Sequence, residues 1–129
     1  MSEPFQKPPF TWRRKFAYAF RGIARGVRGE RSFAVHFFVA IAVLAAAAAL
    51  RCAAWEWCVL LLAIGGVLTA ELFNSAIERL AEAITREERP EIRDALDIAA
   101  GAVFVASAAS VALGAIVFGL RLWSFVSAH

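Results

Sequence analysis

The stretch WCVLLLAIGGVLTAELFNSAIE at residues 57–78 begins as an apolar run and then becomes polar at regular intervals. Glu71, Asn74, Ser75 and Glu78 occupy positions i, i+3, i+4 and i+7 of its final part. An α-helix has about 3.6 residues per turn, so these side chains lie on one side of a helix. Ionised carboxylates are costly next to hydrocarbon, and such a stripe normally faces a protein interior or a wet cavity. We therefore predict a membrane helix whose polar stripe binds cations, relays protons or contacts a substrate.

The composition places this segment in a small, all-α membrane protein. Of the 129 residues, 60% are hydrophobic, which is more apolar surface than an ordinary soluble domain carries. Three windows are long and apolar enough to span a bilayer, at about residues 33–50, 57–77 and 98–120. The alternative of a buried soluble bundle requires more polar surface than these windows leave.

The basic residues predict the orientation of the three spans. Eight precede the first span: Lys7, Arg13, Arg14, Lys15, Arg21, Arg25, Arg28 and Arg31. Four follow the second span: Arg79, Arg86, Arg89 and Arg93. Lysine and arginine near short loops stay in the cytoplasm, so we expect the amino terminus and the 79–97 loop on that side. A cleaved signal peptide is a poorer interpretation of the first span, because the basic leader is about twice the usual length.

The amino-terminal part divides into a tail and a helix. Residues 1–9 contain three of the four prolines and no periodicity, which predicts a disordered or extended tail. From about 10 to 28, two faces repeat at helical spacing: apolar Phe16, Phe20, Ile23 and Val27, and polar Arg14, Tyr18, Arg21 and Arg25. We expect an amphipathic helix in the headgroup region, serving either as a plain anchor or as a binder of phosphate groups.

Acidic residues far apart in the sequence are predicted to meet at the cytoplasmic face. Glu30 precedes the first span, Glu71 and Glu78 lie late in the second, and Asp97 lies just before the third. Carboxylates from different helices can hold Mg²⁺ together with phosphate oxygens and water. Glu71 lies deepest in apolar sequence and is the candidate base, with a neutral hydrogen-bonded carboxylic acid as the alternative interpretation. Glu30 and Glu78 are nearer water and are the candidate metal ligands.

Common nucleotide and hydrolase motifs are absent from the sequence. There is no P-loop, no protein-kinase signature, no Gly-x-Ser-x-Gly elbow and no His-Glu-x-x-His helix. His36 and His129 are isolated, and we interpret His36 as a polar residue at a helix contact. Any nucleotide must therefore be held by another kind of site.

Four segments resemble one known family. AELFNSAIE at 70–78, FAYAFRG at 16–22, ERSFAVH at 30–36 and DIAAGAV at 97–103 are similar, in order and spacing, to segments of the prokaryotic diacylglycerol kinases. These are small integral-membrane lipid kinases that also include undecaprenol kinases. The resemblance covers nearly all of the chain after Pro9, and its most specific part is the Glu-x-x-Asn-Ser-Ala-x-Glu core.

The resemblance implies an assembly and a reaction. We expect a homotrimeric helical bundle in the bacterial inner membrane, with residues 10–129 as one lipid kinase domain and active sites between subunits at the cytoplasmic face. ATP would be the co-substrate and Mg²⁺ the metal. Diacylglycerol would be the first candidate for the lipid substrate and undecaprenol the second. The segments around His36 and at 99–103 are nevertheless closer to those of the undecaprenol kinases.

The resemblance also implies roles for single residues. Glu71 matches the family's proton acceptor, Asn74 a polar residue beside it, and Glu30 and Glu78 the metal ligands next to the ATP phosphates. The remaining expected nucleotide contacts are Tyr18, Glu87, Glu88, Arg89 and Asp97.

One position departs from the family pattern. Leu96 stands where the family commonly has a lysine that neutralises ATP phosphates. We hypothesise that Arg93 or Arg89 supplies this charge, since arginine binds phosphate from many directions. Leucine at position 96 is also compatible with an alternative interpretation, in which the protein is a catalytically inactive scaffold. A non-enzymatic ion or proton conductor is a further alternative, but it has no use for Glu30 outside the spans or for the Tyr18 face of a surface helix.

Overall fold

The computed structural model describes residues 2–28 and 30–128, which form four α-helices and no β-strand. The helices are α1 (Trp12–Val27), α2 (Arg31–Ala49), α3 (Ala54–Ile84) and α4 (Pro90–Ser127). Residues 2–10 have no regular secondary structure and are exposed. Three residues lie outside the described part of the chain: Met1 at the start of the predicted tail, Gly29, and His129 at the end of the predicted domain.

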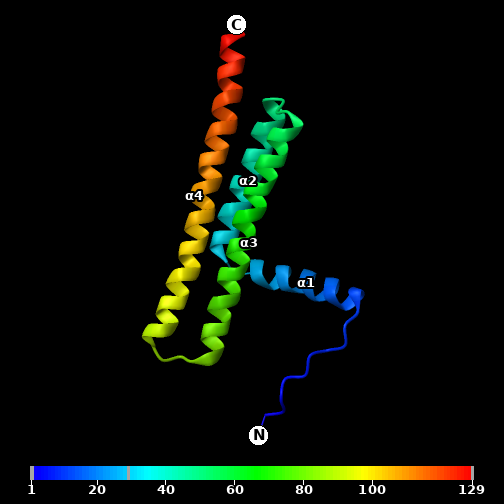
Figure 1. The fold of residues 1–129 in the computed structure, drawn as a ribbon, viewed down its shortest axis with the longest axis vertical. Coiled ribbons are helices and arrows are strands. Elements are labelled where there is room, and N and C mark those ends of the chain that lie inside the picture. The colour runs from blue at the N-terminus through cyan, green and yellow to red at the C-terminus, as the bar shows by residue number, and fades with distance from the viewer. Residues whose placement is uncertain (1, 29, 129) are drawn as a thin grey trace.

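Three of these helices match the predicted spans. Within the described residues, α2, α3 and α4 are long and apolar enough to cross a membrane. Figure 1 shows them running alternately up and down, with α1 projecting sideways from the lower end of α2. The prediction of an all-α membrane protein with three spans is therefore confirmed. The helices α3 and α4 extend beyond the predicted windows of 57–77 and 98–120.

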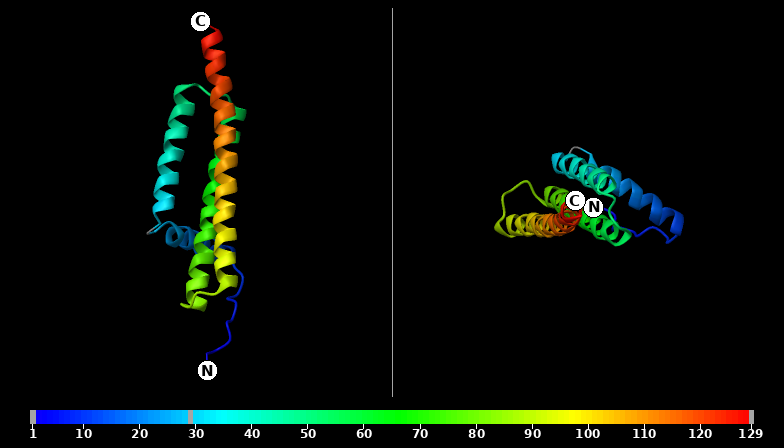
Figure 2. Two further views of the ribbon diagram at one scale, coloured as in Figure 1. Left: turned by 90° about the vertical axis from the view of Figure 1, so that its left-hand side faces the viewer. Right: turned by 90° about the horizontal axis from the view of Figure 1, so that it is seen from above.

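Helix α3 is the central element of the fold. It makes its most extensive contacts with α4 and also contacts α2 and α1. Figures 1 and 2 show α3 and α4 side by side in two directions of view. A small core of Ala47, Leu60 and Val117 joins the three long helices. Large apolar side chains stay outside this core, including Phe104 at 75% exposure, as expected for a surface that meets lipid or another protein chain.

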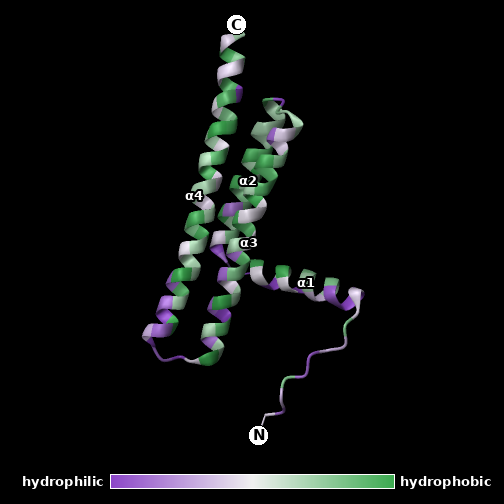
Figure 3. Cartoon of the chain, viewed as in Figure 1, coloured by the Kyte–Doolittle hydropathy of each residue, from purple (hydrophilic) through white to green (hydrophobic). Residues whose placement is uncertain are grey.

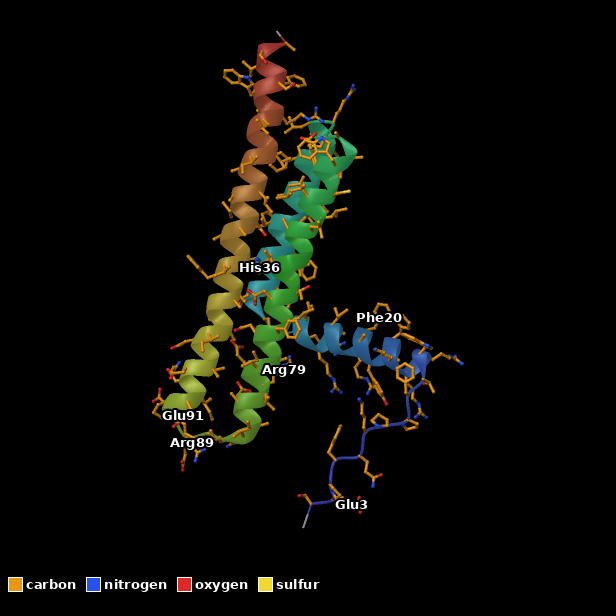
Figure 4. The ribbon with its side chains drawn as sticks, in the orientation of Figure 1. Glu3, Phe20, His36, Arg79, Arg89 and Glu91 are labelled. Carbon is orange, nitrogen blue, oxygen red and sulfur yellow. The ribbon has the colours of Figure 1, made fainter. Side chains whose placement is uncertain are left out.

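Helix α1 is polar along one side and apolar along the other. Figure 3 shows hydrophobic residues mainly along its upper side and hydrophilic residues mainly along its lower side. Phe20 projects on the apolar side (Figure 4). The helix begins at a Thr11 cap, whose hydroxyl oxygen accepts a hydrogen bond from the Arg14 amide at 3.3 Å. This distribution fits the amphipathic helix expected from the sequence.

The turn between α2 and α3 contains a non-glycine residue with a positive φ angle. Arg51 has a φ of 52°, the left-handed region that favours glycine. The Cys52 amide donates to the Ala47 carbonyl at 3.0 Å and the Arg51 amide to Ala48 at 3.2 Å, which is the Schellman pattern of a helix end. The Arg51 carbonyl in turn accepts a hydrogen bond from Arg121 of α4 at 2.7 Å.

A buried ion pair ties α4 to the start of α3 at this same end. Glu56 is 5% exposed, accepts a hydrogen bond from the Ala53 amide at 2.8 Å, and pairs with Arg121 at 2.7 Å. The sequence did not predict this pair. Glu56 and Arg121 lie just outside the predicted second and third spans, which began at residue 57 and ended at residue 120. Since α4 continues to Ser127, Arg121 lies inside the helix and can reach across to its partner.

Replacing Arg121 by Met is expected to destabilise the protein by about 2 kcal/mol, because it leaves the buried Glu56 carboxylate without its cation. The measurement is thermal unfolding in detergent, followed by helical circular dichroism. The double variant Glu56→Gln/Arg121→Met should regain much of the loss, since it removes the unpaired charge. An unchanged melting temperature in the single variant would contradict the stabilising role of this pair.

Candidate active site

The buried Glu71 of α3 meets a histidine of α2. Glu71 is 5% exposed, and its Oε1 lies 2.9 Å from Nε2 of His36. Figure 4 labels His36 where α2 passes α3. The interpretation of His36 as a polar residue at a helix contact is confirmed. Its partner was not predicted, because two residues 35 positions apart have no common sequence pattern.

One turn further along α3, Asn74 contacts the second acid of the polar stripe. The Asn74 Nδ2 group donates to Glu78 Oε1 at 2.9 Å, the i to i+4 contact expected on one helix face. The Asn74 Oδ1 atom is buried and has no hydrogen-bond partner in the described part of the chain. Buried polar atoms are normally satisfied, so this oxygen is available to a donor or a cation that the chain itself does not supply.

Glu30 and Glu78 lie at the same end of the spans. Glu30 is half-buried directly before α2, and its side chain makes no capping hydrogen bond. It precedes His36 by six residues, while Glu78 follows Glu71 by seven. With about 1.5 Å of rise per residue, both acids lie about 10 Å along their antiparallel helices from the His36–Glu71 contact, in the same direction.

The described residues of a single chain do not complete a metal centre. Across residues 2–28 and 30–128, no three His, Cys, Asp or Glu side chains gather closely enough to hold a metal ion. The donors that are present suit a hard cation, since carboxylate oxygens and the unpartnered Asn74 Oδ1 are ligand types that Mg²⁺ accepts. A magnesium ion bound by these donors would need further ligands from phosphate, water or a second chain.

A cavity of about 210 Å³ lies between the end of α3 and the start of α4. Its lining includes one residue of the stripe and several of the predicted 79–97 loop: Glu78, Glu82, Thr85, Glu87, Glu88, Arg89, Arg93 and Leu96. Figure 4 shows Arg89 at the connection between the two helices. The fold thus brings Arg89 and Arg93 to the same cavity as Leu96. Arg93 donates to Glu88 at 2.9 Å, and both side chains are exposed.

Two predicted nucleotide contacts are not among the residues that line this cavity. Tyr18 is 49% exposed on α1, and Asp97 is exposed on α4 one residue beyond Leu96. Neither side chain lines the cavity in the same chain. A role for either residue at a nucleotide therefore requires a ligand that extends beyond the cavity or a neighbouring chain.

Helix α1 docks on α3 beside the polar stripe. A Cβ atom built on Gly26 would come within 2.6 Å of the Leu72 side chain, so the two helices approach closely there. The Arg79 guanidinium donates to the Arg25 carbonyl near the end of α1. A mostly apolar cavity of about 480 Å³ lies between the two helices, and Ser75 is among its lining residues. This mostly apolar space lies next to the stripe, at the level of the surface helix.

Comparison with known proteins identifies the family. The sequence profile of the prokaryotic diacylglycerol kinases matches residues 17–118. The chain belongs to this family. The matched region includes every predicted site residue, from Tyr18 to Asp97.

Two curated relatives carry kinase names. The chain is 38% identical over 105 residues to an undecaprenol kinase of Bacillus subtilis (strain 168), a match covering 81% of this chain and 85% of that protein. It is 35% identical over 100 residues to a diacylglycerol kinase of Synechocystis sp. (strain ATCC 27184 / PCC 6803 / Kazusa), covering 77% of this chain and 57% of that protein. The chain is thus a membrane enzyme of the lipid kinase class, for which ATP is the co-substrate. The alternative of a non-enzymatic conductor has no support from these relatives.

The close approach at Gly26 predicts how this lipid kinase positions its surface helix. Gly26→Val should push α1 away from Leu72, because the added side chain occupies the contact. Gly22→Val is the matched control, since a Cβ at Gly22 meets nothing within 4 Å. Spin labels at Arg21 and Leu80 should report a longer or broader distance for the Gly26 variant only. Equal distributions in both variants would show that the contact does not fix α1.

Proposed function

We propose that the protein transfers the γ-phosphoryl group of ATP to the hydroxyl of a membrane lipid alcohol, with Glu71 as the base. One observation carries this proposal: Glu71 is buried in the apolar part of α3, on the same helix face as Glu78. Glu78 in turn lines the arginine-containing cavity between α3 and α4. A lipid alcohol and a charged nucleotide can therefore approach the same face of α3 from opposite directions.

The reaction needs a proton acceptor and a well-positioned phosphate. The lipid oxygen forms a bond to the γ-phosphorus, the bond to the bridging oxygen of ADP breaks, and the hydroxyl proton passes to the Glu71 carboxylate. Enzymes gain most of the rate of phosphoryl transfer from positioning and charge neutralisation. Asn74 lies between Glu71 and Glu78 on the stripe and positions the second acid through its hydrogen bond.

Glu30 and Glu78 are the proposed ligands of Mg²⁺, with the Asn74 oxygen close to the site. Support comes from the shared end of the spans on which both acids lie and from the unpartnered Asn74 Oδ1. Bound Mg²⁺ would neutralise negative charge on the ATP phosphates. Since few protein groups gather there, phosphate oxygens and water would fill the rest of the coordination sphere.

The nucleotide is proposed to occupy the cavity between α3 and α4. Glu87, Glu88 and Arg89 belong to its lining, and Arg93 offers the charge that the family lysine provides at the Leu96 position. Tyr18 and Asp97 are assigned to the nucleotide through a homotrimer, in which neighbouring chains complete each site. The exposed surface of α4 supports an assembly, because only Ala99 and Val117 of its 38 residues are buried.

The membrane placement follows from the charge distribution. The basic residues before α2 and after α3 lie at the end of the spans that carries the proposed site, as the positive-inside rule requires of a cytoplasmic face. We therefore propose the bacterial inner membrane as the location and its cytoplasmic surface as the site of reaction.

Two lipids are candidates for the phosphoryl acceptor. The match to the undecaprenol kinase is the more identical one and spans more of the relative than the match to the diacylglycerol kinase. Undecaprenol is therefore our first candidate and diacylglycerol the second, the reverse of the order predicted from sequence. Both offer a primary hydroxyl on a long apolar body, which suits a base buried in a membrane helix.

Purified protein in lipid micelles should transfer labelled phosphate from ATP to undecaprenol more efficiently than to diacylglycerol. Glu71→Gln should lower kcat at least about 100-fold, since it removes the proton acceptor. Glu91→Gln, which changes an exposed acid outside the cavity, should have wild-type kinetics. Phosphorylation of diacylglycerol alone would reject undecaprenol as the acceptor, and full activity of Glu71→Gln would reject the base.

The arginines of the cavity predict the ATP requirement. The double variant Arg89→Gln/Arg93→Gln should raise the KM for ATP by about 10-fold or more, because charge-assisted hydrogen bonds to phosphate are lost. Adding Leu96→Lys should restore much of the affinity by returning a cation to the cavity. Arg86→Gln is the matched control, since Arg86 is in the same loop but does not line the cavity. Unchanged ATP kinetics in the double variant would refute the substitution.

A further inference from the structure

We propose that His36 is a positioning residue that holds the Glu71 carboxylate in the orientation needed for proton transfer from the lipid. This inference rests on the proposed role of Glu71 as the base. The sequence placed His36 in a segment that resembles the family and at a helix contact, and gave it no part in the reaction. The contact between the two side chains is the observation that carries the inference.

The chemistry of the contact fixes which atom donates. Glu71 must be an ionised carboxylate to accept a proton, and a carboxylate only accepts hydrogen bonds. Nε2 of His36, 2.9 Å from Oε1, must therefore carry the hydrogen and donate it. Oε1 then accepts this hydrogen bond, which lowers its basicity and leaves Oε2 as the oxygen better suited to receive the proton of the lipid hydroxyl.

The surroundings leave Glu71 dependent on this one donor. In residues 2–28 and 30–128, His36 is the side chain that forms a hydrogen bond or ion pair with Glu71. His36 also lines an apolar cavity of about 240 Å³ between α2, α3 and α4, whose other walls include Val39, Val67 and Leu68. Without this hydrogen bond, no side chain of the described residues would hold the carboxylate against rotation about its last bond. A ring anchored on another helix removes that freedom before the substrate arrives.

A purely structural role predicts different behaviour of substitutions. If His36 served only to pack α2 against α3, leucine would fit the apolar cavity well and glutamine would be the poorer replacement. If His36 positions Glu71, glutamine should be the better replacement, because its side-chain amide can donate to Oε1 and leucine cannot. The two roles therefore rank the same pair of variants in opposite orders.

The experiment compares lipid phosphorylation by His36→Leu and His36→Gln in the full-length protein. We expect His36→Leu to lower kcat by about 10- to 100-fold, a part of what a general base contributes, with the KM for ATP within twofold of wild type. His36→Gln should stay within about fivefold of wild-type kcat. His36→Phe, which keeps a ring without a donor, should behave like the leucine variant. Equal or higher kcat for leucine relative to glutamine would overturn the proposal.

Two controls separate this inference from the proposed function. Ser110→Ala changes another polar residue that lines the same cavity and should leave kcat unchanged. Glu71→Gln/His36→Leu should be no slower than Glu71→Gln alone, because His36 acts through Glu71. If Glu71→Gln is fully active, the proposed base is wrong. If Glu71→Gln is inactive while His36→Leu is fully active, only the role of His36 is wrong.

Discussion

A carboxyl group in the middle of an apolar helix needs a polar partner, and the rest of this structure depends on how Glu71 finds one. The hydrocarbon of lipid supplies no hydrogen bonds, so the partner must come from the protein itself. His36 of α2 provides it at 2.9 Å. This contact joins α2 to α3 in the same register that brings Glu30 and Glu78 to one end of the spans.

Helix α3 carries Glu71 and also contacts every other helix. Its first turn carries Glu56, whose pairing with Arg121 ties α4 in place at the end remote from the stripe. Its middle carries Glu71, and its final part meets α1 through Leu72 and Arg79. The polar stripe therefore lies on a helix that the other three helices contact, which is the arrangement that the proposed positioning of a reacting group requires.

At Leu96, where the family commonly has a lysine, we propose that nearby arginines supply the missing charge. Arg89 and Arg93 line the cavity with Leu96 because a short turn at Pro90 folds the start of α4 back toward the end of α3. Leucine at this position also leaves a wall that is partly apolar. The proposed phosphate contact would then come from one turn earlier on the same helix, where the long arginine side chain can compensate for the different starting point.

The sequence by itself determined the elements and the kind of chemistry. Hydrophobic length predicted the three spans, helical periodicity predicted α1 and the stripe from Glu71 to Glu78, and the same stripe indicated the lipid kinase family. These signals are local, so they can be read along the chain. Only the tertiary structure decided the partners: His36 with Glu71, and Arg121 with Glu56. Such pairs depend on the relative register of helices that are far apart in sequence, which is set by turn geometry and packing and leaves no periodic pattern.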